Sequence, residues 1–72
     1  MEICKNINTG QAFVHLEDRD NDQALMVTPQ GIVKVLEYDL FTELVEVEDK
    51  DALERGEINS TQYEIYNQYR QK

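Results

Sequence analysis

Three carboxylates at alternating positions, Asp18, Asp20 and Asp22, have the only spacing in the chain that resembles a metal-binding motif. Calcium loops of the EF-hand type begin in this way, because alternate carboxylates can converge on one hard cation. The rest of that motif is missing, since Gln23 occupies the position of the turn-forming glycine and Pro29 that of the closing bidentate glutamate. We therefore predict a solvated acidic loop over residues 18–22, and neither a metal nor a cofactor.

The single histidine and the single cysteine, His15 and Cys4, are the other residues with catalytic chemistry. A general base needs an orienting partner and a nucleophile or substrate within reach. In a regular strand Glu17 would share a face with His15 and could orient its ring, but the sequence suggests no nucleophile. Cys4 is a lone thiol in a nonbasic setting, which gives no sign of an activated thiolate. We predict a half-exposed strand position for His15, no catalytic residue and no enzymatic activity.

Tyrosines recur at intervals of three residues near the C-terminus, at positions 63, 66 and 69. A tyrosine ring packs against a core while its hydroxyl reaches water, and tyrosine is also common in interface hot spots. We expect packing first, with an exposed fringe open to a partner. The acids at 43, 46 and 48 are expected to point outward from a strand. The predicted interaction surface consists of Tyr63, Tyr66, Tyr69, Glu43, Glu46 and Glu48.

The net charge is −8, and most of it lies between residues 37 and 57, where nine acids face two bases for a net of −7. Such a surface repels phosphate backbones, so we expect no direct binding to nucleic acid and favour a basic protein partner. Two other interpretations stay open. The acids could only keep the protein in solution, or they could imitate nucleic-acid charge and block a DNA- or RNA-binding protein.

A chain of 72 residues has room for one small domain. Such a chain buries only about 60% of its unfolded surface, and small proteins usually add disulfides, a metal or a partner subunit. One cysteine excludes an internal disulfide, so a homo-oligomer is the supplement left open. No apolar run reaches membrane-spanning length and no secretory leader is recognisable, which predicts a soluble, cytoplasmic protein without a membrane partner.

Residues 1–48 have the pattern of β-structure. The sequence Thr28-Pro29-Gln30-Gly31 predicts a three-residue hairpin loop with a G1 bulge, because proline favours the type I turn and glycine the left-handed position after it. Residues 8–10 form a second turn that joins a strand over 2–7 to one starting at 11, and residues 43–48 alternate as a half-exposed strand. Residues 38–41 fit a strand end or one helical turn started by Asp39, and we predict irregular structure there.

Residues 49–72 have a helical pattern. Asp49 or Asp51 can cap a short helix that Gly56 ends. A second helix is predicted to start at Asn59, with Gln62 three residues later in a capping-box arrangement. Ile58 before the cap and Tyr63 after it are spaced as a hydrophobic staple, and Ile65, Tyr66 and Tyr69 follow at helical spacing.

The run from Leu53 to Tyr69 resembles the SHOCT family of short C-terminal segments. That family has a helix, a Gly-x-Ile-Thr sequence and then an acid-aromatic pair that opens a second helix. The corresponding residues 53–63 are Leu-Glu-Arg-Gly-Glu-Ile-Asn-Ser-Thr-Gln-Tyr. The chain departs from the family at Gln62, where an acid is preferred, and at Asn67, where lysine is frequent. The resemblance implies an appended element for interaction or oligomerisation, and no activity.

Taken together, these patterns predict an α+β domain, with a four- or five-stranded antiparallel meander over residues 1–48 and a helical hairpin over 49–72 packed on it. A small SH3-like barrel with a helical tail is the alternative. For function, we predict a small acidic accessory protein that acts by protein–protein contact, including self-association.

Overall fold

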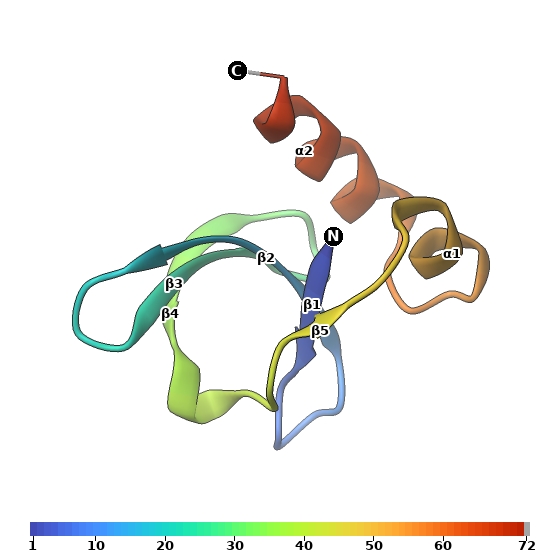
Figure 1. Ribbon diagram of the computed structural model, residues 1–72. Coiled ribbons are helices and arrows are strands. Elements are labelled where there is room, and N and C mark those ends of the chain that lie inside the picture. Colours follow the sequence, from blue (N-terminus) through green and yellow to red (C-terminus); the bar gives the residue numbers. More distant parts are fainter. Residues whose placement is uncertain (72) are drawn as a thin grey trace.

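The computed structural model describes residues 1–71, which form five antiparallel strands, one 3₁₀ turn and two α-helices (Figure 1). The strands are β1 (Glu2–Lys5), β2 (Ala12–Arg19), β3 (Gln23–Val27), β4 (Val33–Glu37) and β5 (Val45–Glu46). The helical elements are η1 (Tyr38–Leu40), α1 (Asp49–Glu54) and α2 (Ser60–Arg70). The predicted α+β class is confirmed.

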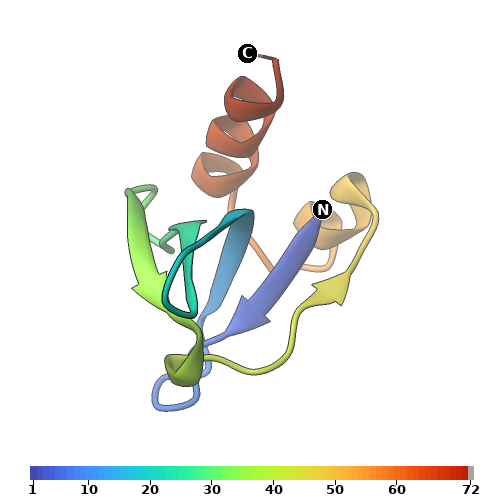
Figure 2. The same ribbon diagram turned by 60° about the vertical axis from the view of Figure 1, so that its left-hand side comes forward.

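The strands lie in the order β4-β3-β2-β1-β5, so the first four form a meander and the fifth joins the opposite edge. The predicted four- or five-stranded antiparallel meander is thus confirmed in its four-stranded form, and β5 extends the sheet at β1. The turn η1 carries the chain away from β4, and the segment that follows is bonded to the end of β1: Phe41 bridges Asn6, and the Thr42 N–H donates to the Lys5 carbonyl at 2.9 Å. The sheet curves strongly but stays open between β4 and β5, so the barrel alternative is not formed (Figure 2).

Two strands are shorter than predicted. The first ends at Lys5, because Asn6 turns the chain through its side chain, which accepts the N–H of Asn8 at 2.8 Å. The strand predicted over 43–48 is reduced to Val45 and Glu46, which pair with the start of β1.

The hairpin loop between β3 and β4 is confirmed. Gly31 has a φ of +83°, and its N–H donates to the Thr28 carbonyl at 2.8 Å, while the Thr28 N–H donates to the Ile32 carbonyl at 2.8 Å. Gly31 is also a close-approach site, since a Cβ there would overlap the methyl group of Thr61 in α2. The loop is thereby fixed both to its own strands and to the helix.

The pairing of β2 with β3 shifts register between His15 and Glu17, which leaves Leu16 as the extra residue of a β-bulge. The strand then continues to Arg19, so the predicted loop over 18–22 shrinks to residues 20–22. Asn21 and Asp22 have φ values of 61° and 57°, a conformation that these two residue types tolerate better than most.

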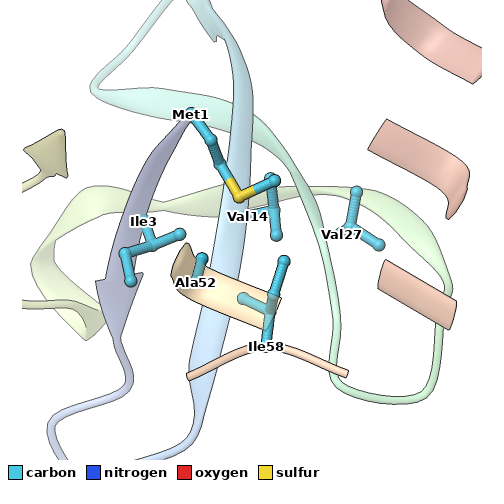
Figure 3. Close-up of a cluster of buried hydrophobic side chains, with 6 residues drawn as sticks. All are labelled: Met1, Ile3, Val14, Val27, Ala52 and Ile58. Carbon is cyan, nitrogen blue, oxygen red and sulfur yellow. The ribbon is translucent and has the colours of Figure 1, made fainter. Parts of the chain in front are cut away.

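Two hydrophobic clusters fill opposite faces of the sheet. One lies between the sheet and the helices and is built from Met1, Ile3, Val14, Val27, Ala52 and Ile58, whose side chains point toward one another (Figure 3). The other fills the concave face beneath η1 and is built from Cys4, Ala24, Met26 and Phe41. Phe13 adds an edge-to-face contact with Phe41, with ring centroids 4.8 Å apart.

Residues 38–41 are not irregular, because Tyr38–Leu40 form a single 3₁₀ turn whose N-cap is Glu37 and not Asp39.

The N-cap of α1 is Glu48, so the predicted cap at Asp49 or Asp51 is wrong. Both aspartates lie inside the first helical turn, where their negative charge interacts favourably with the helix dipole. The stop at Gly56 is confirmed: it has a φ of +74°, and the Glu57 N–H donates back to the Ala52 carbonyl at 3.0 Å in a Schellman arrangement.

The start of α2 is confirmed as predicted. The Asn59 side chain accepts the Gln62 N–H at 2.9 Å, and the Gln62 side chain accepts the Asn59 N–H at 3.1 Å. Gln62 is 1% exposed, and its amide group also donates to the carbonyls of Ala12 at 2.9 Å and Val27 at 3.3 Å. One side chain therefore caps α2 and ties it to β2 and β3.

The helix α2 packs mainly on β2 and β3, and four of the five residues of β4 are exposed. None of the helices within residues 1–71 has the length and apolar character needed to cross a membrane.

Candidate functional site

The predicted interaction surface is divided among three places. Tyr66, Tyr69 and Glu46 line one groove of about 210 Å³ beside α2. Tyr63 and Glu48 line a second hollow along α1, and Glu43 is exposed in the link before β5, where it joins neither. The tyrosines are half-buried, as expected for rings that pack first, and Tyr63 and Tyr66 contact the helix-side core.

The groove beside α2 combines aromatic rings with carboxylates. The Tyr69 hydroxyl donates to Glu17, and this hydrogen bond raises the pKa of Tyr69 above its ordinary value. The Arg70 guanidinium lies 5.4 Å from the centre of the Tyr66 ring and donates to Asp49 in α1. The Asp49 carboxylate thus forms an ion pair with Arg70, whose side chain stays partly exposed.

Two carboxylates at the rim of the same groove, Glu2 and Glu46, are direct cross-strand neighbours of β1 and β5. Like charges at such positions repel each other, so this pair favours a cation between or beside them. Arg70 also lines this groove and already lies over the Tyr66 ring, so a further basic side chain would be attracted to the two carboxylates.

His15 is buried at 8% exposure, so the prediction of a half-exposed position is wrong. Its Nδ1 lies 3.5 Å from a carboxylate oxygen of Glu2, and its Nε2 lies 3.1 Å from Asp18 and 2.9 Å from the Tyr38 hydroxyl. The Tyr38 hydroxyl in turn donates to Asp18. The imidazole is thereby enclosed by groups from three elements, β1, β2 and η1.

Glu17 does not orient His15, contrary to the sequence-based expectation. The bulge at Leu16 turns Glu17 toward α2, where it contacts Tyr69 and the Arg19 guanidinium at 2.9 Å. The same bulge brings Asp18 to the face of His15. The replacement of Glu17 by Asp18 beside His15 follows from the pairing register of β2 and β3. The alternating pattern of one strand does not show that register.

The titration of this cluster is shifted at two groups. Hydrogen bonds from Tyr38 and then from His15 lower the pKa of Asp18 below its ordinary value. Burial, and then the hydrogen bond to Asp18, raise the pKa of Tyr38 to about 12. Burial also raises the pKa of the Cys4 thiol to about 11, which keeps it protonated and unreactive at neutral pH.

The aspartates considered for calcium do not converge. Asp18 belongs to the His15 cluster, while Asp22 lies beside Glu37 and Asp39 in a shallow acidic hollow. Within residues 1–71 no group of three or more histidine, cysteine, aspartate or glutamate side chains is placed to hold a metal ion.

The sequence did not single out the surface along β4, which we call the β4 edge and define by Ile32, Val33 and Val35. These side chains are 57%, 45% and 45% exposed. Their apolar pattern predicted a strand correctly, but not that α2 would stop short of it and that no strand would follow on its far side.

Comparison of the chain with protein-family models, with curated proteins and with solved structures gives no match. The resemblance of residues 53–69 to the SHOCT family therefore stays a prediction.

Proposed function

We propose that this protein acts by protein–protein contact, including association with a second copy of itself, and that it catalyses no reaction. The observation that carries the proposal is the β4 edge, where Val33 and Val35 remain exposed on a strand that is paired on one side only, and Ile32 is exposed just before it.

Exposed apolar side chains scattered singly are common, but a row of them on one strand edge is a typical interaction surface. Burying side chains of this size stabilises an association by about 1.5–3 kcal/mol each when burial is complete. The strand edge adds backbone donors and acceptors that a partner strand can bind.

The groove beside α2 supports a basic partner as a second contact. Glu2 and Glu46 attract a cationic side chain to this groove, in addition to Arg70, which already lies over Tyr66. The resemblance to the SHOCT family supports the same kind of role for the two helices.

A binding role is also supported by the surroundings of His15 and Cys4, the two residues with catalytic chemistry. His15 is enclosed by Glu2, Asp18 and Tyr38, which suits a structural histidine, and the Cys4 thiol is buried. We place the protein in the cytoplasm, where a reduced cysteine is the normal state.

The alternative of nucleic-acid mimicry needs carboxylates in rows at phosphate spacing. Here Glu37 and Glu46 lie on strands at opposite edges of the sheet. In and after α1, Asp51 and Glu57 lie 4.0 and 3.8 Å from the Arg55 guanidinium. These positions favour surface solvation and ion pairing over a row of free charges.

The proposal is tested by sedimentation velocity at two protein concentrations. The wild-type chain is expected to gain mass as the concentration rises, and a Val33→Lys/Val35→Lys variant is expected to stay monomeric with a nearly unchanged melting temperature, since both positions are exposed. The control adds the same two positive charges at exposed neutral positions on α2 and at its C-cap, as Gln68→Lys/Gln71→Lys, and should associate like the wild type. A wild-type chain that stays monomeric at both concentrations would contradict self-association.

A further inference from the structure

The direction of the backbone groups in β4 follows from the two ends of its pairing with β3. The Thr28 N–H donates to the Ile32 carbonyl at 2.8 Å, and the Tyr38 N–H donates to the Asp22 carbonyl at 2.9 Å. In an antiparallel pair, residues bonded to the partner strand alternate with residues whose N–H and C=O point away. Even-numbered residues of β4 therefore bond to β3, and the odd-numbered ones point outward.

The outward residues are Val33, Val35 and Glu37. In the described residues 1–71, β4 has a partner strand only on the side of β3, so the outward N–H and C=O groups of Val33 and Val35 face no strand. The Glu37 carbonyl, at the N-cap of η1, accepts the first hydrogen bond of that turn. Unpaired edge groups of this kind are a template for another strand. What remains is to establish which strand fits.

Resting on the self-association proposed above, we infer that the occupant is β4 of a second copy, paired antiparallel so that Val35 lies opposite Val35 of that copy. The two strands are related by a two-fold axis perpendicular to the sheet. The result is one continuous ten-stranded sheet, with five strands from each copy.

The register is selected by the outward backbone groups. With Val35 opposite itself, Val33 lies opposite Glu37 of the other copy, so all three outward residues form hydrogen-bonded pairs. A shift by two residues in one direction puts Lys34 directly opposite Lys34, and like charges at that position repel. A shift in the other direction moves Val33 past the end of β4 and leaves it without a partner.

Charge explains why the occupant is a second copy and why it meets this edge. A chain with a net charge of −8 repels its own copies, and the edge at β5 carries Glu46 with two further acids close by. In contrast, Lys34 is the only charged residue from 23 to 36, and Glu37 balances it at the end of β4. The β4 edge is thus the neutral, apolar edge of an acidic molecule.

The two-fold axis also determines on which face of the paired sheet the apolar side chains lie. Val33 and Val35 share a face with Val27, the face that α2 covers over β2 and β3. In the paired sheet the helices of both copies lie on this same face, one on each side of the central valines. The two Val35 side chains then contact each other across the central strand pair, and each Val33 lies beside Glu37 of the other copy.

A single-cysteine crosslink tests the register. Opposed residues of a hydrogen-bonded pair have Cα atoms about 5.5 Å apart, which lies within the range of about 4.4–6.8 Å that a disulfide spans. Val35→Cys is therefore expected to form a covalent dimer under mild oxidation. Val33→Cys is the matched control: it is equally exposed, but its two copies are four residues out of register, about 13 Å apart, and should not crosslink.

A mixing experiment gives a second, independent readout. Val33→Cys and Glu37→Cys should each fail to crosslink alone and should form a mixed dimer when combined, because these positions are opposed. The wild-type chain reports on the buried Cys4 and is expected to stay uncrosslinked.

The outcomes separate the two proposals. Crosslinking of Val35→Cys, with the mixed dimer and without the Val33→Cys homodimer, supports the register. A chain that gains mass in sedimentation but crosslinks at none of these positions, or at Val33 as readily as at Val35, overturns the register and leaves self-association standing. A monomer at every concentration overturns both.

Discussion

The Nε2 atom of His15 lies 3.1 Å from a carboxylate oxygen of Asp18, although an unbroken strand would place two residues three apart on opposite faces. The bulge at Leu16 changes the alternation and brings them together. The same residue turns Glu17 to the other face, where it accepts the Tyr69 hydroxyl. One inserted residue therefore builds the His15 cluster and also a contact between β2 and α2.

The decrease in the free energy of unfolding at alkaline pH should depend on Tyr38. Its pKa is raised from 10.0 to about 12, so the folded state favours the neutral phenol. The stabilisation is fully present below pH 10, the pKa in the unfolded chain, and is lost as the pH rises toward 12. Because the pKa of Tyr69 is also raised, tyrosinate absorbance is followed against pH in a Tyr69→Phe background, where it should show a late step that a further Tyr38→Phe change removes and a further Tyr63→Phe change leaves in place. A late step that survives in Tyr38→Phe would contradict this assignment.

Gly31 and Gly10 form a matched pair for separating backbone strain from packing. Both have a positive φ, +83° and +73°, but a Cβ at Gly31 would overlap Thr61, whereas one at Gly10 meets nothing within 4 Å. Gly10→Ala should cost about 1–2 kcal/mol of unfolding free energy from strain. Gly31→Ala should lower the free energy of unfolding by about 1–3 kcal/mol more than Gly10→Ala does, because α2 must shift to make room for the new methyl group. Denaturant midpoints measure both, and equal losses would show that α2 does not rest on the loop.

Gln62 should be the most sensitive polar residue of α2. Its replacement by leucine removes half of the capping box and leaves the carbonyls of Ala12 and Val27 without their donor. The expected loss is about 2–4 kcal/mol, from a lost cap and unsatisfied buried acceptors. Gln68→Leu, an exposed change of the same kind on the same helix, should be nearly neutral. Similar unfolding free energies for the two variants would remove Gln62 from this role.

Calcium should leave the melting temperature unchanged at millimolar concentration, and so should a chelator. Asp18 is already engaged by His15 and Tyr38, and Asp22 faces a different hollow. Ligand binding to the folded state alone would raise the melting temperature. A saturable rise at micromolar calcium that disappears in Asp20→Asn would show that a site exists.

Features decided by neighbouring residues were predicted from the sequence. The loop at Gly31 and the cap at Asn59 depend on local backbone conformation, which proline, glycine and asparagine set directly. Features decided by pairing were not. The bulge at Leu16 and the return of β5 to β1 depend on which strands meet and in what register, and alternation within one strand is silent on both.

The candidate site divides in the same way. The spacing of Tyr66 and Tyr69 placed them on one side of a helix, and the groove does contain both. The apolar pattern around Val33 and Val35 was visible as well, but a strand with apolar residues is normally taken as covered. Only the position of β4 at the sheet edge shows it as a surface.

Amide hydrogen exchange of β4, followed by NMR at two protein concentrations, tests the central claim most directly. The N–H groups of Lys34 and Leu36 bond to β3 within one chain and should be protected at both concentrations. The outward N–H of Val35 should exchange quickly in the dilute sample and become at least tenfold slower in the concentrated one, together with that of Val33. Fast exchange of Val35 at both concentrations, with Lys34 and Leu36 protected throughout, would contradict the proposal that a second copy pairs with this edge.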